Sequence, residues 1–432
     1  MAYDESALIR RLPHGLTDLF LEQAAAKTAV EGVLQETFRR WGYSRIIPPT
    51  FEYYDTLAAG ASVQLKQEMY RFFDREGNIL ALRPDMTVPT ARVVSGKLYD
   101  RTPPLRCYYV GNVFRHIEPQ AGWRREFTQA GIELIGAGTP EADAEVVAVA
   151  VAALKAMKVA DFQVNLGQVS YLQAILSEAG LGNGELWRLE QAIDRRNDIE
   201  LQRVLAELGI TGDAARAIRA VPHLCGDEGV LCEAERLATN PPARQAIEHL
   251  ARVYELLCLE GVAEHIILDL GEMRGMAYYT GITFHGYAAG LGFPICGGGR
   301  YDNLLANFGA DLPAVGFALG VERILLVTHP EIDLAPHLVM RSCSHPACRA
   351  LAAQTRARGS CVEVDVLGRQ GEALVAYARA LGAHYVVCCG EGPTYTLTDL
   401  RSSDPGCRRV LNRHELEQEL ALWSSGMQYI PS

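Results

Sequence analysis

The chain lacks several features that would place it in other classes of protein. Its apolar runs fall short of the roughly 20 residues that a bilayer-spanning helix needs, and its first fifteen residues lack the apolar core of a signal peptide. Its eleven cysteines include no Cys-x-x-Cys pair, which is ordinary usage for a reducing compartment. We therefore expect a cytoplasmic protein with no membrane segment. The net charge of −11 also disfavours binding to a polyanion.

Two short motifs are incomplete as ligand sites. Cys343-Ser-His345-Pro-Ala-Cys348 offers two thiols and an imidazole on a short turn, but structural zinc sites use four ligands and no fourth is in view. The glycines at 297–299 lack the trailing Lys-Ser/Thr of a phosphate-binding P-loop and the glycine spacing of a dinucleotide fold. We therefore expect no metal, no cofactor and no generic nucleotide loop.

The patterns of apolar residues divide the 432-residue chain into two predicted domains. A larger domain covers residues 1–325 and contains a helical insertion at about 168–260, where Ala, Leu, Glu and Arg follow a helical period. Residues 326–337 contain two prolines, Pro330 and Pro336, and form a linker. Residues 338–432 alternate strand and helix patterns, which predicts a small α/β domain. This last segment contains no lysine, so it lacks an obvious basic surface for RNA.

Two helices stand out in the larger domain. Residues 17–41 carry an apolar stripe at helical spacing, and Thr17 or Asp18 is the expected cap. A long apolar helix runs over about 140–157, and Thr139 is its expected cap. Neither helix carries residues that demand a functional site.

A predicted hairpin at residues 107–136 carries the clearest functional pattern. Two alternating runs flank a turn that contains proline and glycine, which indicates two antiparallel strands. Period two puts the apolar residues Ala130, Ile132 and Leu134 on one face with Thr128. The opposite face carries Arg125, Phe127, Gln129, Gly131 and Glu133.

The polar face of this hairpin could be ordinary wet sheet surface, since antiparallel sheets commonly leave one side in water. Three features favour the floor of a cleft instead. Gly131 would allow a ligand to approach the backbone. Phe127 can stack on a planar group, and Arg115 and Arg125 supply positive charge close by.

The same residues resemble the second motif of class II aminoacyl-tRNA synthetases in its histidyl version. Phe114-Arg115 is followed by Arg125-Glu126-Phe127 and by Gln-Ala-Gly-Ile-Glu at 129–133. The resemblance implies an α+β fold with an antiparallel sheet flanked by helices and a C-terminal domain like the anticodon-binding domain. It also implies roles for individual residues. Arg115 would bind the ATP α-phosphate and the amino acid carboxylate, Phe127 would stack on adenine, and Gln129 and Glu133 would hold histidine.

Other stretches extend the resemblance over almost the whole chain. Arg-Gly-x-x-Tyr-Tyr at 274–279 and Gly-Gly-Arg-Tyr-Asp at 298–302 are close to diagnostic of the histidyl family. Arg323 resembles the γ-phosphate arginine of the third motif, although an exposed helix arginine is the alternative. Residues 43–52, with two prolines, read as an edge strand and resemble the first motif, which implies a homodimer. The implied histidine site comprises Asp85, Thr87, Arg115, Gln129, Glu133, Arg274, Tyr278, Tyr279 and Tyr301, and the implied vestigial ATP site comprises Arg125, Phe127 and Arg323.

Departures from the synthetase pattern help to decide between two possible functions of the chain. Ile117 stands where synthetases carry a glutamate that contacts ATP, with Glu118 next to it, and Asp85-Met86 replaces Glu-Gly. In these respects the chain resembles the synthetase paralogues that serve as regulatory subunits of ATP phosphoribosyltransferase. That resemblance implies a non-catalytic chain that works with a short-form catalytic subunit in a hetero-oligomer, responds to histidine and does not use tRNA.

The alternative is an active histidyl-tRNA synthetase that needs ATP, Mg²⁺, histidine and tRNA. The retained Arg274 and Arg323 favour this alternative, as does the full-length C-terminal domain. Ala277 stands where the family often has an aspartate before the tyrosines. We expect the regulatory function, because the lost acid at position 117 belongs to the ATP site.

Overall fold

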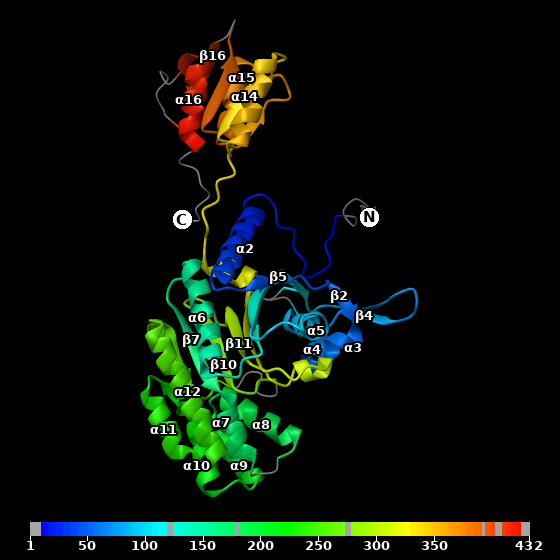
Figure 1. Ribbon diagram of the computed structural model, residues 1–432, viewed down its shortest axis with the longest axis vertical. Helices are drawn as coiled ribbons and strands as arrows, with labels where there is room; N and C mark the ends of the chain where they lie inside the picture. Colours follow the sequence, from blue (N-terminus) through cyan, green and yellow to red (C-terminus); the bar gives the residue numbers. More distant parts are fainter. Residues whose placement is uncertain are drawn as a thin grey trace, which may run out of the picture. The chain divides into compact units, whose positions relative to one another are not determined.

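The structure is a computed structural model (Figure 1), and it describes residues 10–118, 124–177, 181–272, 278–390, 394–401 and 408–424. Arg274 and Ala277 lie outside the described residues. Contacts divide the chain into two units, which are Met1–Leu19 with Ala26–His329, and Phe20–Ala25 with Pro330–Ser432. Within the described part of the chain, no helix has the length and apolar composition of a membrane span.

One large sheet forms the centre of the larger unit, where the described strands follow the order β1-β5-β6-β12-β11-β10-β7-β9-β8. Neighbours from β5 to β7 pair antiparallel, whereas β1 joins β5, and β9 joins β7, in parallel. The position of β1 at the edge confirms the edge strand predicted from its prolines. The strands are β1 (Ser44–Arg45), β5 (Leu105–Phe114), β6 (Glu126–Ile135), β7 (Phe162–Gln168), β8 (Cys225–Gly226), β9 (Ile266–Asp269), β10 (Ile282–Ala288), β11 (Cys296–Arg300) and β12 (Ala314–Gly320).

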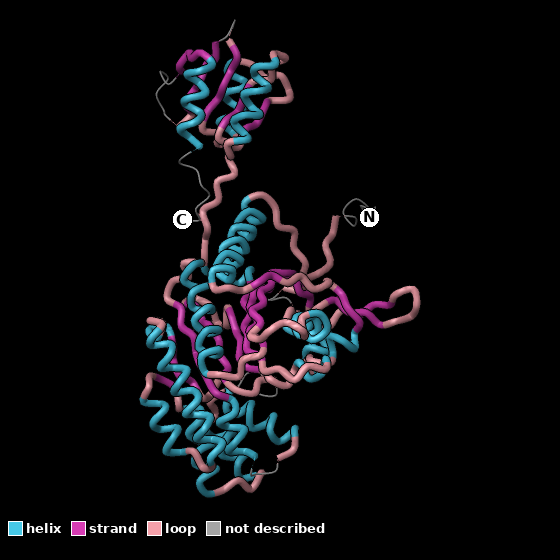
Figure 2. Tube along the Cα trace, viewed as in Figure 1, coloured by secondary structure: helices cyan, strands magenta, loops and turns pink. Residues whose placement is uncertain are grey.

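The hairpin forms as predicted from β5 and β6, and its apolar face is core. Ala130, Ile132 and Leu134 are buried and pack in one cluster with α6 (Pro140–Ala156). Figure 2 shows the cyan helix α6 beside the magenta strands of this sheet. Helix α6 is apolar on nearly every side, as expected of a helix buried all round. Its cap is Thr139, as predicted, because the threonine side chain accepts a hydrogen bond from the backbone N–H of Ala142.

Helix α2 (Glu22–Arg40) begins later than the sequence predicts. The expected cap at Thr17 or Asp18 is wrong, because Leu21 has a positive φ of 48°, which interrupts a right-handed helix at that point. The predicted apolar stripe is correct, since the structure buries Val30, Leu34 and Phe38.

The glycines at 297–299 lie inside strand β11, so they form no loop at all. A Cβ atom at position 299 would lie 2.8 Å from the ring of Tyr279, and one at position 297 would lie 2.7 Å from the ring of His285. The glycines therefore make room for neighbouring side chains, which agrees with the expectation that they are not a nucleotide loop.

The segment predicted to be a helical insertion is helical except for β8, which the sequence does not predict. Helix α12 of this segment packs against α6, and β8 pairs with β9 at the edge of the sheet. The helices are α7 (Val169–Ser177), α8 (Asn183–Asp194), α9 (Asp198–Glu207), α10 (Gly212–Ala220), α11 (Gly229–Leu237) and α12 (Pro241–Leu259).

A second, small sheet of the larger unit has the strand order β2-β4-β3. The turn after β4 leads directly into α5, which brings the predicted residues Asp85 and Thr87 beside the hairpin. The elements are β2 (Phe51–Tyr53), β3 (Arg71–Phe73), β4 (Ile79–Leu82), α3 (Tyr54–Ala58), α4 (Val63–Glu68), α5 (Thr87–Lys97) and, after β12, α13 (Val321–Val327).

The smaller unit has its own sheet in the order β14-β13-β15-β16-β17. Strands β14, β13 and β15 are parallel, and β16 and β17 continue the sheet antiparallel. The strand and helix pattern predicted between residues 362 and 400 is correct, although the sequence analysis missed β13, α14, β17 and α16. The elements are β13 (Leu338–Met340), α14 (Pro346–Ala357), β14 (Val362–Val364), α15 (Gly371–Ala380), β15 (Tyr385–Cys389), β16 (Thr394–Asp399), β17 (Arg408–Asn412) and α16 (Arg413–Ser424).

Candidate functional site

A cavity of about 400 Å³ opens between the start of α5, the end of β5 and the chain before β10, a size typical of small-molecule sites. Several residues that were not singled out from the sequence also line it, among them Glu68 and His285. The predicted residues that line it are Asp85, Thr87, Arg115, Tyr278 and Tyr279.

Glu133 is a buried carboxyl group surrounded by hydroxyl groups. Its side chain is 1% exposed, and it accepts hydrogen bonds from the hydroxyls of Tyr109 at 3.1 Å, Tyr301 and Thr87. Burial raises the pKa of Glu133 to about 7, and the three hydroxyl donors oppose that rise because they stabilise the ionised form. The group therefore changes charge near neutral pH.

The predicted tyrosines come together on one side of Glu133. The rings of Tyr278 and Tyr301 stack with centroids 5.5 Å apart, and Tyr279 packs edge-on against Tyr278 at 5.2 Å. Burial holds the pKa of Tyr278 and of Tyr301 well above the usual value. These hydroxyls consequently stay protonated and can donate hydrogen bonds at neutral pH.

Asp85 and Arg115 form the charged edge of the cavity. An Asp85 oxygen accepts a hydrogen bond from the Val88 N–H at 3.2 Å, and Nε of Arg115 donates to the Pro84 carbonyl at 2.8 Å. Burial raises the pKa of Asp85, and the positive charge of Arg115 opposes that rise. Asp85, on the turn before α5, and Arg115, directly after β5, thus present an acid and a cation to one cavity.

Gln129 is tied to that same turn, because its side-chain oxygen accepts a hydrogen bond from the backbone N–H of Met86 at 2.9 Å. The expected role of Gly131 is wrong. A Cβ atom at Gly131 would meet the Phe317 carbonyl and would lie 2.8 Å from the Tyr109 hydroxyl. The glycine therefore makes room for protein atoms and not for a ligand.

The residues predicted for the ATP site lie at the other end of the hairpin. The Arg115 guanidinium stands 5.4 Å from the centre of the Phe127 ring. Arg125 donates from Nε to the Ile117 carbonyl at 3.1 Å, and Arg323 donates from Nη1 to the Pro294 carbonyl at 2.7 Å.

The charges of Arg115 and Arg323 act on each other. Burial, with a smaller contribution from the positive charge of Arg115, lowers the pKa of Arg323 to about 10. Both side chains remain cationic at neutral pH, so this end of the cleft attracts anions. Residue 117 is isoleucine, so no carboxylate at that position offsets the positive charge of the two arginines.

Two site residues that the sequence analysis missed each lie opposite a glycine on the neighbouring strand. Tyr109 pairs across the sheet with Gly131, and His285 pairs with Gly297. In each case the glycine leaves space that the large side chain on the neighbouring strand occupies. A glycine in a predicted strand therefore points to its cross-strand partner as a candidate site residue.

His285 also extends the polar wall of the cavity. Its Nδ1 atom lies 3.4 Å from a carboxylate oxygen of Glu272, and the Tyr287 hydroxyl donates to the other oxygen of Glu272 at 3.1 Å. Both acidic and imidazole groups here are nearly buried. The sequence analysis did not connect them, because Glu272 follows the end of β9 whereas His285 and Tyr287 lie on β10.

Comparisons with known proteins agree with this geometry. The histidyl-tRNA synthetase family model matches residues 15–324. A protein of Moorella thermoacetica named ATP phosphoribosyltransferase regulatory subunit is 40% identical over 380 residues, which is 87% of this chain and 97% of that protein. A protein of the same name from Geobacter metallireducens is 37% identical over 86% of this chain and 87% of its own length.

Solved structures show the same fold. A structure from Bacillus halodurans, described as an ATP phosphoribosyltransferase regulatory subunit/histidyl-tRNA synthetase, has a TM-score of 0.79 and 31% identity, and the match covers 89% of this chain and 99% of that one. The histidyl-tRNA synthetase of Nostoc has a TM-score of 0.80 at 21% identity, over 96% of this chain and 99% of that one, and shares the fold. The chain therefore belongs to the histidyl-tRNA synthetase family and, within it, to the ATP phosphoribosyltransferase regulatory subunits.

Proposed function

We propose that the chain regulates a short-form ATP phosphoribosyltransferase by binding free histidine, and that it does not itself charge tRNA. The observation that carries this proposal is the buried Glu133, with its three hydroxyl donors, beside a cavity of small-molecule size. A carboxyl group held in this way is costly to bury. A polar ligand that pairs with it recovers part of that cost.

Histidine fits the chemistry of this cavity at three points. An imidazole N–H can donate to the ionised carboxylate of Glu133, the α-amino group can pair with Asp85 beside Thr87, and the carboxylate can pair with Arg115. Each of these protein groups is wholly or partly buried, so a ligand without the matching group would lose a hydrogen bond to a charged group, which contributes about 1.5–3 kcal/mol. The pocket therefore selects histidine over other amino acids. Gln129, the tyrosines and Arg274 complete the predicted site.

Regulation requires that histidine favour one arrangement of the complex over another. A ligand that bound both arrangements equally would change nothing, and couplings of this kind are typically about 1–3 kcal/mol. The turn before α5 can change its conformation when histidine binds. It carries Asp85 and is hydrogen-bonded to Gln129 through the Met86 N–H.

A second candidate function is histidine activation as in a synthetase. It is favoured by the arginines at the anion-binding end, where Arg115 and Arg323 lie close enough for their charges to interact, and by Phe127 beside Arg115. We place it second because Ile117 removes the acid of the ATP site. Lysine is also absent from the smaller unit, so we infer that tRNA is not a ligand.

The first-motif region supplies a surface for a homodimer within the hetero-oligomer. Apolar side chains are exposed on this region, with Ile47 at 75% and Phe51 at 51%, and on β3 of the same small sheet as Phe51, with Phe73 at 73%. Exposed apolar residues that gather in one region mark interaction surfaces. A dimer formed here, in a cytoplasmic complex with the catalytic subunit, would cover them.

The test is reconstitution with a short-form catalytic subunit. We expect phosphoribosyltransferase activity that depends on this chain and falls when histidine is added. Histidine-dependent exchange of pyrophosphate into ATP is measured on the same preparation. Appreciable exchange would favour the synthetase, and activity that ignores both the chain and histidine would contradict the proposal.

The Glu133→Gln variant separates the two parts of the proposal. We expect it to support activity as the native chain does but to lose inhibition by histidine, because Glu133 is 1% exposed and so is not on a surface that a partner chain can contact. If the variant stayed sensitive to histidine, the pocket would be wrong even though the partnership stood.

A further inference from the structure

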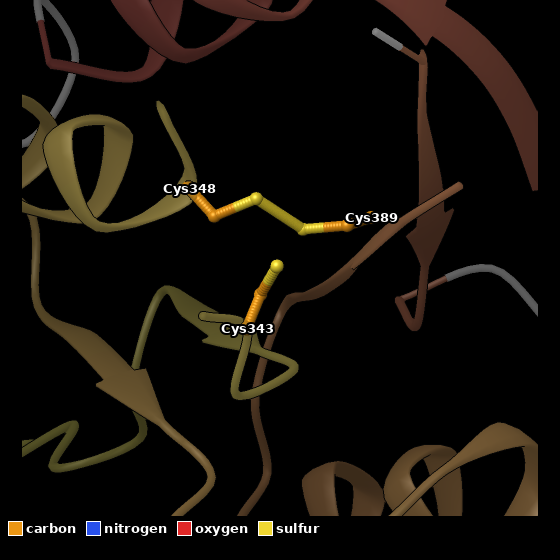
Figure 3. Close-up of side chains that lie close together, drawn as sticks. All are labelled: Cys343, Cys348 and Cys389. Carbon is orange, nitrogen blue, oxygen red and sulfur yellow. A yellow bond between two sulfur atoms is a disulfide. The ribbon is translucent and has the colours of Figure 1, made fainter. Parts of the chain in front are cut away.

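Three cysteine sulfurs meet in the smaller unit, as Figure 3 shows. The Sγ atoms of Cys343, Cys348 and Cys389 all lie within 4.8 Å of one another in the described part of the chain. Cys348 is buried, and the other two are partly exposed. In the sequence, Cys343 and Cys348 lie on one short turn with no further ligand nearby. The fold brings Cys389, which is 41 residues after Cys348, to the same place.

The topology of the sheet explains why these residues converge. Strands β13 and β15 are parallel neighbours, so their C-terminal ends lie side by side. Cys343 follows β13 by three residues, Cys389 is the last residue of β15, and Cys348 lies in the first turn of α14. The strand ends and the helix N-terminus therefore form one cluster, and the helix N-terminus favours a thiolate at Cys348.

The neighbours of the cluster also suit thiolates. The backbone N–H of His345 donates to the Cys343 sulfur at 3.3 Å, and hydrogen bonds of this kind hold metal ligands in place. His345 itself is not one of the converging groups. Its Nδ1 atom accepts a hydrogen bond from the Ala347 N–H at 3.2 Å and thereby caps α14.

The structure joins Cys348 and Cys389 by a disulfide, but two observations favour a different use of the cluster. The Cα atoms of the two residues are 7.2 Å apart, beyond the range of about 4.4–6.8 Å that disulfides usually span. A disulfide also leaves the third sulfur, that of Cys343, without a role. A metal ion uses all three sulfurs, and tetrahedral zinc with Zn–S bonds of about 2.3 Å needs them about 3.8 Å from one another.

We propose that, in the reduced chain, Cys343, Cys348 and Cys389 bind a thiophilic divalent metal ion such as Zn²⁺. The group of described residues provides three ligands, so the fourth position is filled by water or by a small donor from solution. The ion would join the loop after β13, helix α14 and strand β15 of the smaller unit. It is independent of the histidine pocket and of the proposed function.

The test is a titration of the full-length chain with Co²⁺, in the presence of a phosphine reductant, followed by competition with Zn²⁺. We expect one equivalent to bind with thiolate-to-cobalt charge-transfer absorption, which Zn²⁺ then displaces. The Cys343→Ser variant removes one ligand at a partly exposed position. Its affinity should fall more than about a hundredfold, since even outer hydrogen-bond partners contribute about ten- to a hundredfold.

The matched control is Cys388→Ser. Cys388 is adjacent to Cys389 on β15, but it packs against a different apolar cluster, with Leu374 and Val386, on the other face of the sheet. This variant should bind the metal as the native chain does. Equal affinity in Cys343→Ser, or no thiolate absorption in the reduced native chain, would overturn the proposal. So would a Cys348–Cys389 disulfide that mass spectrometry still detects after reduction.

Discussion

The two ends of the cleft are built in different ways. At the end proposed for histidine, the amino acid end, side chains bind one another, and Glu133 accepts hydrogen bonds from Tyr109, Tyr301 and Thr87. At the end proposed for phosphate groups, the phosphate end, guanidinium groups donate to backbone carbonyls. The acceptors are Ile117 for Arg125 and Pro294 for Arg323.

This difference in hydrogen bonding indicates which end selects between ligands and which end supplies positive charge. A buried carboxylate among hydroxyl groups favours a ligand whose donors match its geometry, so we expect this end to discriminate between ligands. An arginine held by a neutral carbonyl keeps its full positive charge, so we expect the other end to attract anions with little discrimination. We therefore expect changes at Glu133 to affect histidine and changes at Arg323 to affect phosphate groups.

The largest expected effect is the loss of histidine binding in Glu133→Gln. The variant cannot supply the negative charge that the imidazole N–H faces, and a lost hydrogen bond to a buried charged group costs about 3 kcal/mol, or more than a hundredfold in Kd. Titration calorimetry measures the change. The control Glu126→Gln alters an acid at the far end of β6, which accepts a hydrogen bond from Asn112 at 2.7 Å, and it should leave histidine affinity intact. Unchanged affinity in Glu133→Gln would remove the distinction between the two ends.

The stability of the ligand-free chain should show the cost of that buried carboxyl group. The pKa of Glu133 rises from 4.5 to about 7 on folding, so between these values the folded state holds a proton that the unfolded state has lost. Stability therefore falls as the pH rises from about 4.5 to about 7, by on the order of 3 kcal/mol, and the cost stays fully present above pH 7.

Glu133→Gln should remove this cost. Thermal denaturation at pH 5 and pH 8 measures it, and the midpoint of the variant, relative to the native chain, should be higher at pH 8 than at pH 5. A difference that did not depend on pH would show that the carboxyl group ionises normally.

A smaller effect separates Arg115 from Arg323. Arg115→Gln should weaken histidine binding about tenfold, because it removes the cation that pairs with the ligand carboxylate. Arg323→Gln should leave histidine binding within about twofold and weaken binding of ATP, since its guanidinium serves the phosphate end. Equal losses of histidine affinity in both variants, measured by calorimetry, would show that the two ends act as one.

The smallest expected effect is that of Ile117→Glu. The substitution restores an acid at the phosphate end, where it can hold Mg²⁺ that accompanies ATP. We expect a few-fold gain in affinity for ATP with Mg²⁺ and no change in affinity for histidine. A fluorescent ATP analogue measures the gain, and Ile117→Gln is the uncharged control. If the glutamine variant matched the glutamate variant, the missing charge would not explain the phosphate end.

The local elements of this protein follow from sequence patterns. The apolar alternation of β6 and the capped helix α6 form where the residues predict them. The start of α2 could not be predicted, because it depends on the backbone conformation at Leu21. Strand β8 was missed for a similar reason, since two residues become a strand through pairing with β9.

Candidate site residues could be named from the sequence where a residue with suitable chemistry lies within a family motif. Asp85, Tyr278 and Tyr279 were named in this way and line one cavity. Glu133 does not line it, but Glu133 accepts a hydrogen bond from Thr87, which does. Tyr109 and His285 were missed because their roles depend on which glycine lies across the sheet. Sequence order alone does not show that pairing.

The sequence by itself determined the period of each strand and helix, the family to which the chain belongs and the identity of the charged groups. These are local properties, because side-chain alternation and capping act over a few residues. The tertiary structure decided which groups meet. It buried Glu133 among hydroxyls from three separate segments and brought Cys389 to Cys343 and Cys348, since burial and convergence arise when distant strands pair.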